Sequence, residues 1–284
     1  MFEKFGRSWN LVKASADVLG KDRELLVFPL ISTIALTIVV LCFALPVFGL
    51  ASFDMLSRGP NGDPSPLVYV VAFLFYFVQY SVIFYFNTAL VGAAMIRLKG
   101  GDPTVSDGLK IASSKIGVIL GYAFVAATVG MILRVIQERV GFIGKIIVGL
   151  LGAGWSIATY LVVPVLASRD VGPIEAIKES ATLLKQTWGE NLIGQAGLGL
   201  AFGLIMIGVI ACSAFLVILA FMSHSVIVIG AAFFIAALAI AVTALVQAAL
   251  SGIYAAALYR YATDGEGSTG FDKGALQLAF APKG

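Results

Sequence analysis

Charged and reactive side chains are scarce in this sequence. Lysine, arginine, aspartate and glutamate make up 12% of the 284 residues, about half the share that soluble domains carry. There are two cysteines and one histidine. Cys42 and Cys212 both fall inside apolar runs, where a thiol behaves as a small hydrophobe. They therefore indicate neither a disulfide framework nor a redox compartment.

The residues that several catalytic mechanisms need are also missing. His224 is the only histidine, and the sequence contains no Gly-x-Ser-x-Gly and no phosphate-binding glycine loop. Zinc sites, catalytic triads and nucleotide sites therefore lack the residues from which they are normally built. We expect a protein that is not an enzyme, that carries no metal or cofactor, and that binds no nucleic acid.

Long apolar runs dominate the chain instead. Hydrophobic residues make up 60% of the sequence and the mean hydropathy is +0.98. A run of roughly 20 apolar residues is long enough to cross a bilayer, and the charges that interrupt the chain leave room for six. The sequence thus predicts an all-α polytopic membrane protein with these spans: Leu25 to about Leu50, Leu67 to Ile96, Ile116 to about Ile136, Ile146 to Ala167, Leu192 to Met222, and Val226 to Tyr259.

An amphipathic segment, Gly172 to Gly189, separates the fourth span from the fifth. Pro173 suits the first turn of a helix, and Asp170 or Gly172 can cap it. Such a helix lies in the headgroup plane or against helix ends at that level. Its predicted apolar stripe recurs at intervals of three and four and consists of Ile174, Ile177, Ala181, Leu184 and Trp188.

Two further segments repeat this pattern. Met1 to Glu24 carries an apolar stripe that includes Trp9, Val12, Ala16 and Leu19. Before the third span, Asp102-Pro103 is predicted to cap and begin a helix. Its predicted stripe is Val105, Leu109, Ala112 and Ile116.

A short likeness links the three amphipathic segments. Val12-Lys13-Ala14-Ser15 is similar to Ile177-Lys178-Glu179-Ser180 and, more loosely, to Leu109-Lys110-Ile111-Ala112-Ser113. Common ancestry and the general need for basic connectors both explain it. We therefore expect one transmembrane domain, 1–261, with possible units 1–97, 102–167 and 171–261, each an interfacial helix followed by a transmembrane hairpin. A polar tail follows at 262–284.

The basic residues predict the topology. All but four of the nineteen lysines and arginines fall on the side of the N-terminus, and the four exceptions are Arg58, Arg134, Arg139 and Lys145. Cytoplasmic loops carry the excess of lysine and arginine. We expect a multi-pass protein of the inner (plasma) membrane, with both termini and all three amphipathic helices on the cytoplasmic side.

Few polar residues interrupt the predicted spans. No ionisable group lies mid-span, which disfavours an ion-coupled site, and Arg134, Glu138 and Arg139 are expected to snorkel or to pair at the end of the third span. The candidate intramembrane residues either line a path or form hydrogen bonds between helices, and they are Gln79, Asn87, Gln195 and Gln247.

The candidate headgroup contacts come from the amphipathic segments. Lysines near a negatively charged leaflet attract its lipids, and tryptophan favours the interface. The candidates are Lys13, Lys110, Lys178, Lys185, Trp9 and Trp188. Expected partners are membrane lipids with anionic headgroups on the cytoplasmic face, with a protein partner or a second copy of the chain as further options.

Several stretches also resemble a known family. They are Glu24-Leu25-Leu26-Val27-Phe28-Pro29, Gly172-Pro173-Ile174-Glu175-Ala176-Ile177, and Ala256-Ala257-Leu258-Tyr259-Arg260-Tyr261-Ala262 with Gly270-Phe271-Asp272. The chain resembles an uncharacterised family of six-span bacterial and archaeal membrane proteins. It is more distantly similar to the membrane domain that accompanies some glycerophosphodiester phosphodiesterases. The resemblance implies architecture, and it carries over no catalytic residue.

Two functions remain open at this point. The first is a non-enzymatic membrane module that binds lipid or a partner protein, which the three amphipathic helices favour. The second is a channel or transporter for a small or amphiphilic solute, which the mid-span polar residues favour.

Overall fold

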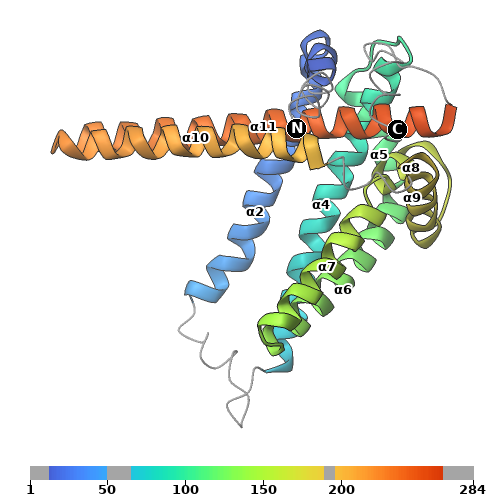
Figure 1. The fold of residues 1–284 in the computed structure, drawn as a ribbon, viewed down its shortest axis with the longest axis horizontal. Helices are drawn as coiled ribbons and strands as arrows, with labels where there is room; N and C mark the ends of the chain where they lie inside the picture. Colours follow the sequence, from blue (N-terminus) through green and yellow to red (C-terminus); the bar gives the residue numbers. More distant parts are fainter. Residues whose placement is uncertain (1–12, 50–64, 189–195, 265–284) are drawn as a thin grey trace. The chain divides into compact units, whose positions relative to one another are not determined.

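The computed structural model describes residues 13–49, 65–188 and 196–264, and in these ranges the chain is helical without a strand (Figure 1). The predicted all-α fold is confirmed. Residues 13–21 form a short helix. The elements that follow are η1 (Arg23–Leu26), α2 (Val27–Gly49), α4 (Pro66–Leu98), α5 (Val105–Ser114), α6 (Ile116–Arg139), α7 (Phe142–Ala158), α8 (Val162–Ser168), α9 (Pro173–Trp188), α10 (Ala196–Met222) and α11 (Val226–Asp264).

Six of the described segments are long and apolar enough to cross a membrane. They correspond one for one to the predicted spans. This agreement has a simple physical basis, because hydrocarbon tolerates only backbone whose polar groups are satisfied internally, as in a helix. The six segments are Arg23–Leu45, Pro66–Leu98, Ile116–Arg139, Phe142–Ser168, Phe202–Met222 and Val226–Asp264.

The fourth span differs from its prediction, because it is broken into α7 and α8. The break at residues 159–161 lies just before Pro164. Proline has no N–H to donate to the carbonyl of Tyr160, four residues earlier, and its ring crowds that carbonyl. The break frees backbone groups, and one of them becomes an attachment point for α9.

The described residues pack as two compact units. The first comprises residues up to Leu26, Ala94–Pro103 and those from Lys185 onward, and the second comprises Val27–Ala93 and Thr104–Leu184. This division follows packing within the folded chain. The three units expected from the sequence, 1–97, 102–167 and 171–261, are a different kind of division and stay a prediction.

In the second unit, aromatic side chains join the long helices. The rings of Phe43 on α2 and Phe75 on α4 have centroids 5.3 Å apart. The ring of Phe73 on α4 lies 5.4 Å from that of Phe124 on α6, and α6 pairs with α7. Figure 1 shows α5, α8 and α9 gathered at one end of α4, α6 and α7. The short amphipathic helices therefore share one end of this unit.

In the first unit, α10 and α11 form an antiparallel hairpin (Figure 1). His224 in the turn has φ 53°, a left-handed conformation in which histidine is tolerated better than most residues. The second half of α11 is the buried part, with Ile253 and Leu258 fully enclosed, and η1 packs against α11. The predicted role of His224 as a polar turn residue agrees with this position.

The end of α4 in the first unit closes with a glycine motif. Gly100 has φ +88°. Its N–H donates to the carbonyl of Arg97 at 2.8 Å, and the N–H of Gly101 donates to the carbonyl of Ile96 at 3.0 Å. This is the Schellman arrangement, which needs a residue that adopts a left-handed conformation without strain.

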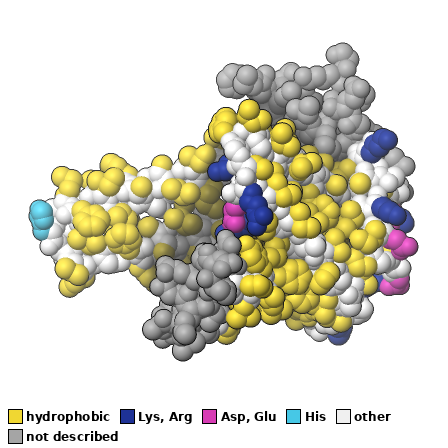
Figure 2. Space-filling model, turned by 90° about the horizontal axis from the view of Figure 1, so that it is seen from below, with side chains coloured by type: hydrophobic (Ala, Val, Ile, Leu, Met, Phe, Trp, Pro, Cys, Tyr) yellow, Lys and Arg dark blue, Asp and Glu magenta, His cyan; other side chains and the backbone are white. Residues whose placement is uncertain are grey.

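Large apolar side chains are exposed along the long helices. Val226, Ile227 and Phe234 on α11 are 85%, 84% and 70% exposed. Figure 2 draws one face of the molecule, on which hydrophobic side chains cover much of the described surface and charged side chains lie at a few positions. A soluble monomer rarely carries apolar patches of this extent, and the surface suits contact with acyl chains.

Candidate functional site

The amphipathic helix α9 begins where the sequence predicts. Pro173 is its first residue, and Gly172 precedes it as the cap. The backbone N–H of Gly172 donates to Glu175 Oε2 at 3.2 Å, which is the reach-back half of a capping box. Asp170, the other predicted cap, instead pairs with Lys115 at the start of α6.

The buried face of α9 is narrower than predicted and shifted to one side. Ala176, Ser180 and Leu184, spaced by four residues, are 0%, 0% and 3% exposed. Among the stripe residues whose side chains the structure describes, Leu184 alone is buried, whereas Ile177 and Ala181 are half-buried and Ile174 is 52% exposed. Leu184 thus lies against protein, and Ile174, Ile177 and Ala181 form a more exposed apolar side next to it. Hydrophobicity alone cannot separate side chains that face protein from those that face lipid.

Ser180 attaches α9 to the broken fourth span. Its Oγ accepts a hydrogen bond of 3.0 Å from the backbone N–H of Leu161, and Leu161 is 1% exposed. This bond satisfies a donor that the break frees, and an unsatisfied donor in such a place is costly. Close packing adds a second attachment, because a Cβ added at Gly121 on α6 would lie 2.8 Å from Pro173 Cγ.

Ion pairs complete the attachment of α9. Lys115 Nζ donates to the carbonyl of Arg169 at 3.1 Å besides pairing with Asp170. Arg169 Nη1 lies 3.0 Å from Glu179 Oε1 on α9. The start of α6, the end of α8 and one side of α9 are therefore joined at a single level.

The remaining face of α9 is exposed and mixed. At 3.6 residues per turn, Ile174, Ile177 and Ala181 lie beside the buried face, and Lys178 and Lys185 border them on the far side. Both lysines are exposed. Around the helix, a side that packs on protein is thus followed by an apolar side and then by lysines. This arrangement is expected of a helix that lies at a membrane interface.

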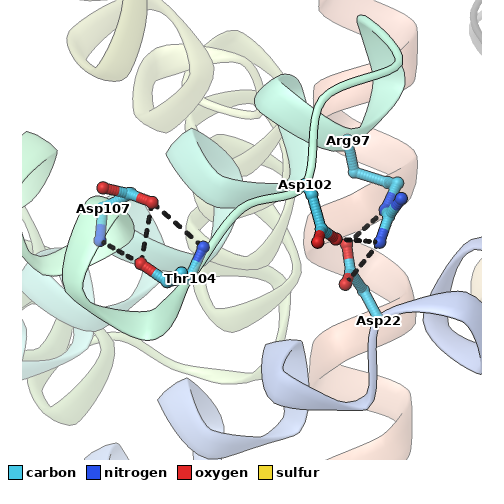
Figure 3. A network of polar contacts seen from close by, with 5 residues as sticks. All are labelled: Asp22, Arg97, Asp102, Thr104 and Asp107. Carbon is cyan, nitrogen blue, oxygen red and sulfur yellow. Dashed lines mark hydrogen bonds and ion pairs between the residues drawn. The ribbon is translucent and has the colours of Figure 1, made fainter.

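Helix α5 is capped differently from the prediction. Thr104 is its N-cap, and Thr104 and Asp107 form a capping box (Figure 3). The Thr104 hydroxyl donates to Asp107 Oδ2 at 2.7 Å, and the Thr104 N–H donates to the same oxygen at 3.1 Å. These bonds hold the pKa of Asp107 below its usual value. Asp102, predicted as the cap, pairs with Arg97 instead.

Two glycines bring α5 against the long helices of the second unit. A Cβ at Gly108 would meet Phe28 Cζ at 2.5 Å and the carbonyl oxygen of Ala89 at 2.7 Å, and one at Gly92 would meet the Ile111 side chain at 2.9 Å. Lys110 on the outer side has a side chain that is 75% exposed. Helix α5 therefore repeats the arrangement of α9, docked on one side and basic on the other.

The helix of residues 13–21 belongs to the first unit and leads into an ion-pair cluster. Lys13 is exposed and Ser15 is buried. Arg97 Nη2 donates to Asp22 Oδ1 at 2.7 Å and to Asp102 Oδ1 at 2.8 Å, and Arg97 Nε donates to Asp22 Oδ2 (Figure 3). The Asp22 side chain is only 7% exposed, so this bidentate pair is largely removed from water.

A shared burial pattern links the three amphipathic helices. Each has an exposed lysine followed two residues later by a fully buried small residue. The sequence likeness pointed to these positions, but sequence reasoning missed that the small residues are fully buried. The pairs are Lys13 with Ser15, Lys110 with Ala112, and Lys178 with Ser180.

The intramembrane candidates are not brought together in one unit. Gln79 and Asn87, both half-buried, lie on α4 in the second unit, and Gln247, also half-buried, lies on α11 in the first. Gln195 and Trp9 lie outside the described residues. Trp188 is the last residue of α9, and its side chain is likewise outside what the structure describes.

Comparison with known proteins gives a family and no activity. No curated protein matches the chain, so the more distant resemblance to the membrane domain found with some glycerophosphodiester phosphodiesterases gains no support and stays a prediction. Residues 67–271, which cover five of the six long apolar segments apart from Pro66, match a family of unknown function. The chain belongs to that family, DUF6159.

Proposed function

We propose that the protein is a non-enzymatic membrane module that binds anionic lipid headgroups through the exposed basic faces of α9, α5 and the helix of residues 13–21. The observation that carries this proposal is the order of side chains around α9. One side packs on protein through Ala176, Ser180 and Leu184. The next presents Ile174 and Ile177, and Lys178 and Lys185 follow.

The expected role is selection of lipids rather than attachment to the membrane. A cationic residue near an anionic leaflet contributes about 1 kcal/mol. Six membrane-spanning helices already hold the chain far more strongly than this. The basic faces are therefore proposed to gather anionic headgroups around the protein on the cytoplasmic side of the plasma membrane, where both termini also lie in this proposal.

Transport of a small or amphiphilic solute is the alternative function. It requires Gln79, Asn87 and Gln247 to line one path. Gln79 and Asn87 lie on α4 and Gln247 lies on α11, and all three are half-buried. The basic faces are shared by three helices and have a defined geometry on α9, so they support lipid binding more directly.

Spin-labelled lipids test the proposal on the full chain in vesicles of phosphatidylcholine and phosphatidylglycerol. The ratio of the association constants of labelled phosphatidylglycerol and phosphatidylcholine is measured by electron paramagnetic resonance. Lys178→Gln/Lys185→Gln is expected to lower this ratio several-fold, and raising the salt concentration is expected to lower it in the unaltered protein.

Arg58→Gln/Arg139→Gln is the matched control, because it removes two cations from the predicted opposite side. Its ratio should stay within twofold of that of the unaltered protein. An unchanged ratio in the α9 variant, or an equal loss in both variants, would overturn lipid binding at this face. A change in oligomeric state with an unchanged lipid ratio would assign the face to a protein partner instead.

A further inference from the structure

The end of α6 that lies away from α5 and α9 carries an open polar depression in the second unit. It has a volume of about 540 Å³, within the range of small-molecule sites. The lining residues on α6, Gly130 to Glu138, lie about 21–33 Å along the helix from Ile116 at 1.5 Å per residue, so the depression is far from the end that α5 and α9 share. Its lining residues are Gly130, Leu133, Arg134, Gln137, Glu138 and Lys145.

Arg134 is held in place by two neighbours. Its Nε donates to Glu138 Oε1 at 3.1 Å, and its Nη1 donates to the hydroxyl of Tyr76 on α4. Its guanidinium carbon also lies 6.0 Å from the centroid of the Tyr76 ring. A guanidinium has five N–H donors, so three of them remain for a ligand.

Lys145, at the start of α7, adds a second cation. Its ammonium forms no ion pair with any described residue, and the side chain is exposed. Gln137 also lines the depression and supplies an amide. With Arg134, Lys145 and Glu138 all charged, the lining carries a net charge of +1, and its donors outnumber its acceptors. A singly charged anion with several oxygens fits this balance.

Exposed apolar side chains flank Lys145 along the start of α7. Phe142, one turn before Lys145 on α7, is 80% exposed, and Ile146, which follows Lys145, is 51% exposed. A free anion gains nothing from contact with apolar side chains, whereas the acyl chains of a lipid would remove these side chains from water. The combination of donors and an adjoining apolar surface therefore favours an amphiphile over a soluble ion.

We propose that this depression, the Arg134 site, binds the phosphodiester of a phospholipid headgroup. Arg134 and Lys145 contact the phosphate oxygens, Gln137 donates to one of them, and the acyl chains pass over Phe142 and Ile146. Glu138 accepts the hydrogen bond from Arg134 Nε and lowers the net positive charge of the lining, so it limits how strongly the site holds an anion. The site is separate from the basic face of α9, so either assignment can fail without the other.

Lipid binding to the full-length protein in detergent tests the proposal. Native mass spectrometry measures the dissociation constant of the first dioleoyl phosphatidylglycerol that binds. Arg134→Gln/Lys145→Gln is expected to weaken binding at least tenfold. Arg139→Gln removes a cation of the same helix end that does not line the depression, and it should change binding less than twofold.

A second variant keeps the test decisive if the double variant unfolds. Glu138→Gln raises the net charge of the lining to +2 and is expected to tighten phosphatidylglycerol binding several-fold. Weakening of equal size in Arg139→Gln and in the double variant would overturn the site, because it would mean a non-specific charge effect. Unaltered or weaker binding in Glu138→Gln would also overturn it.

Two further probes distinguish the source of the phosphate. Excess inorganic phosphate should leave the bound phosphatidylglycerol in place, and dioleoylglycerol, which has the same chains without phosphate, should bind at least tenfold more weakly. Displacement by inorganic phosphate would assign the site to a free anion and overturn the lipid assignment. Equal binding of dioleoylglycerol would mean that Arg134 and Lys145 do not contribute to affinity, and it would overturn the proposed phosphate contacts. In the Lys178→Gln/Lys185→Gln background, Arg134→Gln/Lys145→Gln should still weaken binding by the same factor, because the two basic surfaces are separate.

Discussion

Arg97 is the residue on which the ion-pair cluster of the first unit depends. Its guanidinium provides both hydrogen bonds to Asp22, and the Asp22 side chain is 7% exposed. Removing one partner of a buried pair leaves an uncompensated charge. Arg97→Gln should therefore lower the free energy of unfolding by about 3 kcal/mol, the low end of the usual range for such a loss. Thermal melting in detergent measures the effect.

Asp102→Asn is the control for this prediction. Asp102 contacts the same guanidinium, but its side chain is 92% exposed, and exposed pairs contribute at most about 1 kcal/mol. Its melting temperature should stay close to that of the unaltered protein. Equal losses in the two variants would show that burial of Asp22 does not govern the stability of the cluster.

Gly121 and Gly117 form a natural matched pair on α6. They share the small-residue spacing that the sequence reveals, but only Gly121 meets another helix, 2.8 Å from Pro173 Cγ, while a Cβ at Gly117 has nothing within 4 Å. Gly121→Ala should destabilise by about 1–3 kcal/mol through overpacking. Gly117→Ala should be neutral or should stabilise by up to about 1 kcal/mol through helix propensity. Melting temperatures that shift in the same direction would refute the contact with Pro173.

At the scale of the element, α9 has two apolar sides with different tasks. Leu184 is 3% exposed on the side that packs on protein, so Leu184→Asp should cost at least about 3 kcal/mol, more than creating a cavity there. Ile177 is only half-buried, and Ile177→Asp should cost clearly less. Both variants should stay in the membrane fraction, because the six spans are unchanged.

Melting temperature and fractionation together check the prediction for α9. Ile174→Asp is the control, since Ile174 is 52% exposed and has little protein contact to lose. An unchanged melting temperature in Leu184→Asp would mean that the buried face has no structural partner, and the docking of α9 would have to be abandoned.

Helix α5 should be sensitive to acid through its capping box. The hydrogen bonds from Thr104 lower the pKa of Asp107 in the folded protein. A group whose folded pKa is depressed stabilises the protein above its unfolded pKa, about 3.9 for aspartate, and that stabilisation is lost as the pH falls through the folded pKa. The stability difference between the unaltered protein and Asp107→Asn should thus be constant near neutral pH and shrink below about pH 4.

Melting curves between neutral and acid pH measure this difference. The stability difference between Thr104→Val and Thr104→Val/Asp107→Asn should be smaller at every pH, because the hydroxyl that donates to Asp107 is gone. A difference that grows as the pH falls would contradict the assigned direction of the pKa shift.

The sequence predicted the long helices well and the short ones less well, for a physical reason. A span such as α6 is specified by a run without charges, and each of its apolar residues suits either lipid or protein. In α9 that ambiguity matters, because Ile174 and Leu184 are equally hydrophobic yet have opposite environments. The break before Val162 was missed because Pro164 is tolerated in many membrane helices, and the effect depends on which neighbour satisfies the freed N–H.

At the scale of the whole molecule, no motif in the sequence marks the Arg134 site. Arg134 and Glu138 were expected to pair, and they do so at 3.1 Å. Their approach to Lys145 depends on the turn between α6 and α7, which the sequence does not specify in three dimensions.

The distribution of charge over the second unit bears on the topology. Lys110, Lys115 and Lys178 belong to the end formed by α5, α9 and the start of α6, and Arg134, Arg139 and Lys145 belong to the other end. The packing of this unit therefore keeps apart the two groups of basic residues that the sequence assigns to opposite sides of the membrane. Within the unit the separation is consistent with the predicted direction of each span.

The positive-inside rule then predicts which end faces the cytoplasm. A reporter active only outside the cytoplasm should give no signal when fused after Gly284 and a strong one when inserted near Asn61, because the stretch around Asn61 contains only Arg58 as a basic residue. A reporter active only inside the cytoplasm should give the reverse at the same two positions, which controls for loss of expression. Signal outside from the fusion after Gly284 would place the C-terminus outside. The basic faces of α5 and α9 would then lie on the less anionic leaflet, and the proposed gathering of anionic lipids would lose its basis together with the topology.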